Sequence, residues 1–221
     1  MVVDITSDTL TAPFTGIDEA DFDVFAVPGL EMRMEALKAH LRPKLTGIGE
    51  YMAPLLSEWI EKPFYAHVAK HARRKTNPPN DSWVAFSFNQ RGYKKWPTFM
   101  IGAWQTHVFV QFGVIYESPY KADFGRAILT ESKRVLELLP SNYRMYPDHM
   151  KPEGVALDQL SSDQFEHIAT RVIEKKNADL LFGISLMREE VLQMSGEELL
   201  DQLKTAMIPL AKLYVLTVAQ L

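Results

Sequence analysis

The sequence contains no cysteine among its 221 residues. This absence excludes thiol nucleophiles, iron–sulfur clusters and cysteine-ligated zinc, and it leaves no disulfide to support the fold. Such a composition fits a reducing compartment, so we expect a cytoplasmic protein. Long hydrophobic stretches are also missing, because the apolar runs near residues 108–116 and 180–187 fall short of the ~20 residues that span a bilayer. Residues 1–4 do not resemble the start of a secretory signal, and we expect no membrane partner.

Common motifs for phosphate binding and nucleophilic catalysis are missing as well. There is no G-x-x-x-x-G-K-[ST] loop and no G-x-G-x-x-G fingerprint, and residues 183–187 (GISLM) lack the second glycine of a G-x-S-x-G elbow. His67 and His71 are four residues apart, but Val68 stands where an H-E-x-x-H zinc protease needs glutamate. We therefore expect no bound metal and no cofactor.

What is present is the composition of a globular protein. Hydrophobic residues make up 47% of the chain and charged residues 24%, a balance that excludes a disordered tail or a fibre. The length suits one domain of ordinary size. Residues 1–20 show no clean hydrophobic period and are predicted to form a loose arm, followed by a single domain over residues 21–221.

Hydrophobic periodicity predicts both helices and strands in the chain. The predicted helices cover residues 30–41, 45–59, 64–74, 119–139, 161–173 and 195 onward, and Pro43 either kinks one long helix or separates two. The predicted strands cover residues 83–88, 98–104, 107–117, 143–146 and 180–187. The first three of these strands are joined by short connections and should pair as an antiparallel meander. The order lacks strict βαβ alternation and predicts an α+β fold, with an antiparallel or mixed sheet flanked by helices.

The charge is unevenly distributed along the chain. The formal net charge is −4, yet residues 62–104 hold eight basic side chains against Asp81 alone, a local charge of +7. Concentrated positive potential attracts anions, and interleaved aromatic rings can stack on bases. We therefore predict a binding module for a phosphate-bearing ligand, a nucleotide or a nucleic acid. The predicted ligand-binding residues are His71, Arg73, Arg74, Arg91, Lys94, Lys95, Trp96, Trp104 and Gln111.

A structural interpretation of the same cations stays open. Basic residues at the carboxyl end of a helix interact favourably with the helix dipole, and lysines in a hairpin loop protect an edge strand from pairing with another chain. The two interpretations differ in whether the clusters at residues 70–75 and 91–95 meet in space, which the sequence does not decide.

The longest predicted strand offers a second candidate site. One of its faces is shared by His107, Phe109, Gln111, Gly113, Ile115 and Glu117, while the other face is apolar. Polar groups in the middle of a sheet must be hydrogen-bonded or line a pocket. A small-molecule hydrolase or transferase with a pocket over this face is therefore an alternative, using His107, Gln111 and Glu117, with His107 as general acid or base. A third hypothesis is a structural or partner-binding protein, which an exposed apolar patch would favour.

Several segments resemble one known family. They include residues 33–38 (RMEALK), 67–74 (HVAKHARR), 91–95 (RGYKK) and 115–119 (IYESP). In this order they resemble the YktB-like family of uncharacterised bacterial proteins, from about Asp21 to the carboxyl end. The resemblance implies a cytosolic single-domain α+β protein and carries no assigned reaction and no catalytic residues.

Overall fold

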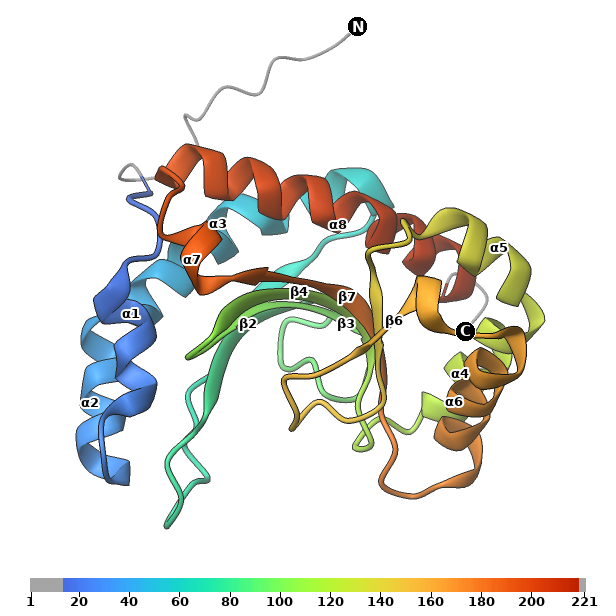
Figure 1. Cartoon of the computed structure of the whole chain (residues 1–221), viewed down its shortest axis with the longest axis horizontal. Coiled ribbons are helices and arrows are strands. Elements are labelled where there is room, and N and C mark those ends of the chain that lie inside the picture. The colour runs from blue at the N-terminus through green and yellow to red at the C-terminus, as the bar shows by residue number, and fades with distance from the viewer. Residues whose placement is uncertain (1–13, 219–221) are drawn as a thin grey trace, which may run out of the picture.

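The computed structural model describes residues 14–218, which form an α+β fold around one open antiparallel sheet (Figure 1). The seven strands are ordered β1-β2-β3-β4-β7-β5-β6. The strands are β1 (Tyr65–Val68), β2 (Asp81–Ser87), β3 (Thr98–Trp104), β4 (His107–Val114), β5 (Arg144–Tyr146), β6 (Val155–Ala156) and β7 (Leu180–Met187). The helices are α1 (Glu19–Asp23), α2 (Leu30–Ala39), α3 (Leu41–Ile60), α4 (Lys121–Thr130), α5 (Ser132–Leu138), α6 (Ser162–Glu174), α7 (Arg188–Val191) and α8 (Gly196–Val218).

The predicted meander is confirmed by the pairing of β2, β3 and β4. Val84 pairs with Ile101, and Ile101 in turn pairs with Val110, so apolar residues of three strands stand in one row. All strand pairs in the described residues are antiparallel. Of the two sheet types expected from the sequence, the structure therefore has the antiparallel one.

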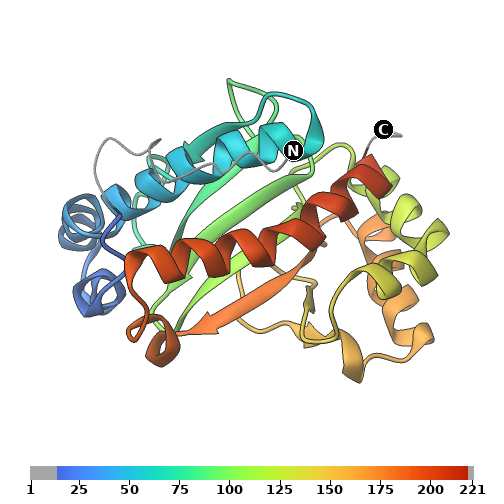
Figure 2. The ribbon, with the colours of Figure 1, turned by 90° about the horizontal axis from the view of Figure 1, so that it is seen from above.

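The main core lies between the convex face of the sheet and the helices α3 and α8. These two helices lie side by side over the sheet (Figure 2). Val108, Val110 and Phe112 project from β4 into this core and are fully buried. Removing such side chains from water is the main force that holds a sheet against its helices. The apolar face predicted for this strand is therefore confirmed.

Local signals in the sequence set several helix boundaries correctly. The helices α2 and α3 meet at His40, so the interruption near Pro43 separates two helices. Ser161 and Gln164 form the expected capping box of α6. Ser195 and Glu198 exchange the same two hydrogen bonds at the start of α8. Each box supplies partners to backbone N–H groups that have none within the helix.

Two predicted helices differ from the structure. The helix predicted over residues 119–139 is two helices, α4 and α5, with Glu131 between them. The helix predicted over residues 64–74 is wrong. Residues 64–74 contain β1 instead, which pairs with β2 from Tyr65 opposite Ser87 to Val68 opposite Val84. His67 and His71 consequently do not share a helix face, because His67 lies on β1 and His71 lies in the following turn with φ +50°. The segment has weak periodicity because β1 is an edge strand and only half-buried, and pairing with its neighbour outweighs local propensity.

The amino-terminal segment is described only in part. Residues 1–13 of the expected arm lie outside the described residues. Further along, Ile17 is buried and Asp18 caps α1, as its position before residues 19–23 indicates. The domain boundary at residue 21 stays a prediction. Within residues 14–218, no helix is both long enough and apolar enough to cross a bilayer.

Candidate ligand-binding site on the concave sheet face

The concave face of the sheet, turned away from α3 and α8, carries a second and smaller apolar cluster (Figure 1). Its buried floor is made by Ala85, Met100, Phe109, Tyr146 and Leu181. The half-buried rings of Trp83, Tyr93 and Trp104 pack against this floor. Aromatic rings held in this way are rigid and keep part of their surface available for contact.

Three loops border the concave face (Figure 1). The loop over residues 69–80 is attached through His71, whose Nε2 lies 3.1 Å from Ser82 Oγ. The loop over residues 88–97 is attached through Tyr93, whose hydroxyl accepts a 3.0 Å hydrogen bond from Trp83 Nε1. In the loop over residues 147–154, the Gly154 carbonyl accepts a hydrogen bond from Arg144. These loops bring residues distant in sequence to one side of the sheet.

Gln111 and Trp104, both predicted site residues, lie on this face. Gln111 is buried opposite Met100 and Gly183 and lies beside Tyr146, whose hydroxyl lies 3.1 Å from Ser185 Oγ. The polar face of β4, which was expected to need partners, therefore has a polar neighbour at Gln111.

Charges from both predicted clusters act on His71. Burial, together with the positive charges of Arg74, Arg42 and Lys94, lowers the pKa of His71 to about 4. His71 is therefore neutral at pH 7. Arg74 and Lys94 therefore act on the same imidazole from the loops at residues 69–80 and 88–97.

The other predicted cations are arranged differently. Arg73, Arg91 and Lys95 have exposed side chains on the same two loops. Arg74 donates weak hydrogen bonds to the carbonyls of residues 77 and 78 at 3.3 and 3.5 Å. Lys94 forms a 2.6 Å ion pair with Glu117, and both side chains are partly exposed. Such a pair contributes little to stability and leaves both charges accessible to a ligand.

Trp96 lies apart from the concave-face aromatics. Its ring stacks on Tyr120 at 4.5 Å between centroids. It also lines a small cavity of about 110 Å³ together with Lys62 and Tyr214, a residue of α8. The structure thus brings Trp104 and Gln111 together and leaves Trp96 on the side of α8.

His107 and Glu117 do not come together. His107 is the first residue of β4, and Glu117 follows the far end of that strand. An eight-residue strand is on the order of 25 Å long, too far for one acid–base pair. His107 is buried, its Nδ1 lies 2.9 Å from Thr106 Oγ1, and its Nε2 has no hydrogen-bond partner among the described residues.

Sequence reasoning missed several groups near this face. Asp81 was not among the predicted site residues, although it is 7% exposed and starts β2 on the concave side. Trp83 lies on the same face of β2 as Asp81, as the alternation of the strand predicts, but it was not among the predicted site residues. Asp179 had no usable signal, because it is placed by long-range contacts with Tyr116 and His149. Tyr93 was one of the aromatic residues interleaved with the second basic cluster, but its hydrogen bond with Trp83 was not predicted.

One group of side chains has the composition of a metal site. The ligand atoms of Asp148, His149 and Asp179 lie within 4.8 Å of one another. The Asp179 carboxylate, however, already accepts hydrogen bonds from the backbone N–H groups of Tyr116 and His149 and contacts His149 Nδ1 at 2.6 Å. These contacts explain the group as a hydrogen-bonded connection through which Asp179 holds the loop over residues 147–154 and the backbone at Tyr116.

Asp81 and His107 should change the pH dependence of stability in opposite directions. Burial raises the pKa of Asp81 from 3.8 to about 6, so its contribution to stability falls as pH rises through that window. Burial lowers the pKa of His107 from 6.5 to about 4, so its contribution rises with pH over that window. Each effect is at most ~1.4 kcal/mol per pH unit.

Urea unfolding between pH 4 and 7 would measure both effects. We expect Asp81→Asn to steepen the rise of the unfolding free energy with pH and His107→Gln to flatten it. Parallel profiles for the wild type and both variants would contradict the assigned burial.

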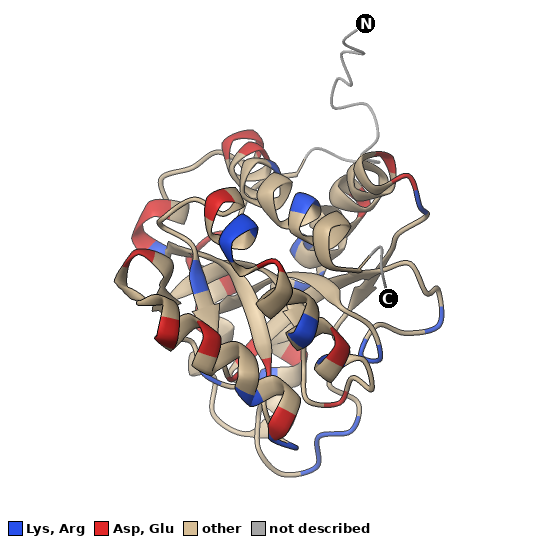
Figure 3. Cartoon of the chain, turned by 90° about the vertical axis from the view of Figure 1, so that its right-hand side faces the viewer, with Lys and Arg blue, Asp and Glu red and all other residues tan. Residues whose placement is uncertain are grey.

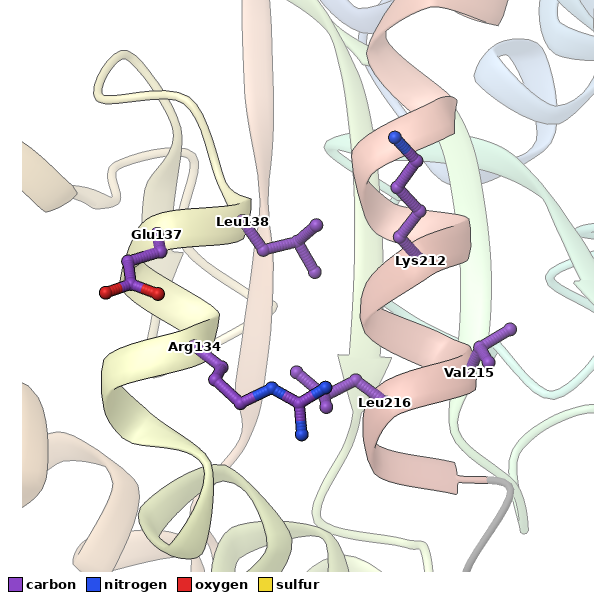
Figure 4. A pocket seen from close by; sticks show the side chains of 6 residues that line it. All are labelled: Arg134, Glu137, Leu138, Lys212, Val215 and Leu216. Atoms are coloured by element: carbon purple, nitrogen blue, oxygen red, sulfur yellow. The ribbon is translucent and has the colours of Figure 1, made fainter.

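A separate groove lies between α5 and α8 on the helical side (Figure 4). It measures about 390 Å³ and is lined by Arg134, Glu137, Leu138, Lys212, Val215 and Leu216. None of the predicted site residues line it, and the candidate site remains the concave face of the sheet.

The fold and this face define a class of α+β protein with helices packed on one side of an antiparallel sheet and a loop-bordered aromatic face on the other. A family model described as "Domain of unknown function (DUF1054)" matches residues 17–214. The chain belongs to this family, which confirms the resemblance to uncharacterised bacterial proteins of the YktB-like type.

Curated relatives agree over most of the chain. A UPF0637 protein of Bacillus velezensis is 45% identical over 197 residues, which cover 89% of this chain and 94% of that protein. A UPF0637 protein of Bacillus licheniformis is 45% identical over 199 residues, covering 90% and 94%. One from Bacillus cereus strain G9842 is 44% identical over 196 residues, covering 89% and 94%.

Proposed function

We propose that the protein is a binding module for a phosphate-bearing ligand, a nucleotide or a nucleic-acid strand, held on the concave face of the sheet. The observation that carries the proposal is that the charges of Arg74 and Lys94, from two different loops, both act on His71, whose ring packs against the half-buried Trp83 at 5.4 Å between centroids. Cations contact phosphate oxygens, and aromatic rings stack on bases.

The charge distribution supports an anionic ligand. The whole chain is acidic, whereas the window that supplies β1, β2, β3 and their loops is basic. Figure 3 shows blue loop segments along its lower edge, which is the concave side in Figure 1, while the helices carry red and blue together. An anion would therefore be drawn toward the concave side, with an on-rate that falls as salt is added.

The aromatic rings support a ligand with a flat group. The Trp83 indole is fixed by its hydrogen bond to Tyr93, and the Tyr93 ring lies 5.8 Å from that of His67. Rings fixed before binding lose little entropy when a base stacks on them, and such stacking contributes roughly 1–3 kcal/mol per base. Neutral His71 adds a hydrogen-bonding group without repelling a cationic neighbour.

Binding assays at low salt test this proposal. We expect tryptophan fluorescence to be quenched on titration with GMP, AMP or a short single-stranded RNA in about 20 mM salt. The paired variant Arg74→Gln/Lys94→Gln should weaken RNA binding by about tenfold and reduce its salt dependence by about two charges. Lys133→Gln on α5, whose side chain is 89% exposed, is the matched control and should bind as the wild type does.

Absence of binding by all three probes at low salt would overturn the proposal. Equal affinities for the wild type and the paired variant would also overturn it, because the cations would then not hold the ligand. Thermal unfolding of each variant separates lost binding from lost folding.

The alternative of a small-molecule hydrolase or transferase has less support, since His107 and Glu117 lie at opposite ends of β4. The partner-binding alternative requires an exposed apolar patch. Exposed apolar side chains such as Met32, Met150 and Val215 belong to α2, a loop and α8, and this separation does not favour that alternative. A cytoplasmic location stays a prediction.

A further inference from the structure

Two buried ionisable side chains flank Trp104 at one end of the concave face. Asp81 is the register partner of Trp104 on β3. Ala103 pairs with Val108, so Trp104 and His107 stand at the two ends of the tight β3–β4 turn and face each other. Asp81 is 7% exposed and His107 is 5% exposed, whereas Trp104 between them is half-buried.

Asp81, Trp104 and His107 form a row across three neighbouring strands, and the spacing of this row suits one planar ring system. Neighbouring antiparallel strands lie ~4.8 Å apart, so the backbones of Asp81 and His107, two strands apart, are separated by roughly 10 Å. Side chains at paired positions point to the same face of the sheet. A bicyclic base with a ~2.9 Å hydrogen bond at each edge spans a similar width.

The hydrogen-bonding state of the two flanking groups also indicates a ligand. His107 Nε2 is buried and has no partner among the described residues, and such an unpaired group is costly unless something else completes it. Burial keeps the His107 pKa near 4, so the imidazole is neutral. In the tautomer in which Thr106 donates to Nδ1, the free Nε2 carries the proton and is a donor.

Asp81 presents the complementary chemistry on the other side of Trp104. The charges of His149 and Arg74 act on the Asp81 carboxyl, and its own backbone N–H is also close to it, while the Arg74 guanidinium is bonded to the carbonyls of Asn77 and Pro78. The two carboxylate oxygens of Asp81 are acceptors that match two parallel N–H donors.

We propose that Asp81, Trp104 and His107 form a subsite for a guanine base, with Trp104 stacked on the ring face. Guanine presents two adjacent donors, its N1–H and its exocyclic amine, to the Asp81 carboxylate, and an acceptor, N7, on the opposite edge to His107 Nε2. Adenine has an acceptor at N1, which the carboxylate repels. This inference rests on the proposed function and specifies the ligand class of the same site.

Competition between GMP and AMP tests the guanine subsite. We expect the wild type to prefer GMP by about tenfold or more, the discrimination expected of one bidentate contact. Asp81→Asn is nearly isosteric, and it should bring the two affinities to within about twofold while RNA binding through the loops persists. His107→Phe should weaken GMP several-fold and AMP less.

Matched control variants and an independent readout separate the outcomes. Asp158→Asn and His167→Gln change exposed residues elsewhere and should leave the preference for GMP unchanged. On addition of GMP, the ¹⁵N resonance of His107 Nε2 should shift. If nucleotides bind without preference, or if the preference survives Asp81→Asn, the guanine subsite is wrong and the proposed function stands. If GMP, AMP and RNA all fail to bind, both proposals fall.

Discussion

Replacing Gly183 with alanine should destabilise the protein by more than ~3 kcal/mol, because the added methyl group has no space. Gly183 lies in the middle of β7, opposite Gln111 on β4 and Arg144 on β5. A Cβ at this position would overlap the Val110 carbonyl oxygen and lie 2.9 Å from the Cα of Gln111. Both obstacles are backbone atoms of a buried strand, so only separation of β4 from β7 relieves the overlap.

Chemical denaturation of Gly183→Ala beside Gly92→Ala measures this effect. A Cβ at Gly92 would have no atom within 4 Å, so that variant should stay within ~0.5 kcal/mol of the wild type. Because Gly183 lies beneath the concave face, a partly folded Gly183→Ala protein should also lose ligand binding. Coincident unfolding midpoints for the two variants would show that the close approach of β4 and β7 is wrong.

Replacing Asp179 with alanine should cost about 3–5 kcal/mol and release the loop over residues 147–154 from the sheet. The Asp179 carboxylate is 4% exposed, accepts hydrogen bonds from the N–H groups of Tyr116 and His149 at 2.6 and 2.7 Å, and contacts His149 Nδ1 at 2.6 Å. Burial alone would raise the pKa of this carboxyl, but the hydrogen bonds outweigh burial and hold the pKa below its ordinary value. Its contribution is therefore present above about pH 4 and is lost as pH falls through the lowered pKa.

Hydrogen exchange at the amides of Tyr116 and His149 measures the release of the loop, and denaturation measures the cost. Asp148→Ala is the matched control, since Asp148 is more exposed, accepts one 2.9 Å hydrogen bond from Met150 and has a distant ion pair with Lys151. We expect that control to cost less than ~1 kcal/mol. Equal exchange rates in both variants would contradict the role assigned to Asp179.

The sequence predicted the parts of the fold that follow from local periodicity and capping. Apolar alternation located β2, β3 and β4 and separated the two faces of β4 correctly, because one face packs on helices. The run of residues 180–187 was predicted as a buried strand, and it is a strand of which residues 180–183 are buried while Met187 is exposed. These features depend on neighbours within a few residues.

What the sequence did not predict depends on long-range pairing. The edge strand β1 has one side without a strand neighbour and an irregular burial pattern, so its residues resemble a helix as closely as a strand. The meeting of Asp81, Trp104 and His107 follows from strand register, which periodicity does not fix. The action of the Arg74 and Lys94 charges on His71 depends on how two loops fold over the sheet.

The outermost strands of the sheet have a consequence for the behaviour of the protein in solution. β1 contains four residues and β6 only two, so each rim of the sheet presents few open peptide groups to another molecule. Short edge strands of this kind protect against β-pairing between molecules. Lys62 and Pro63, which precede β1, add a charge and a residue without a backbone N–H. The concentrated protein should therefore resist fibril formation even though its interior strands are strongly apolar.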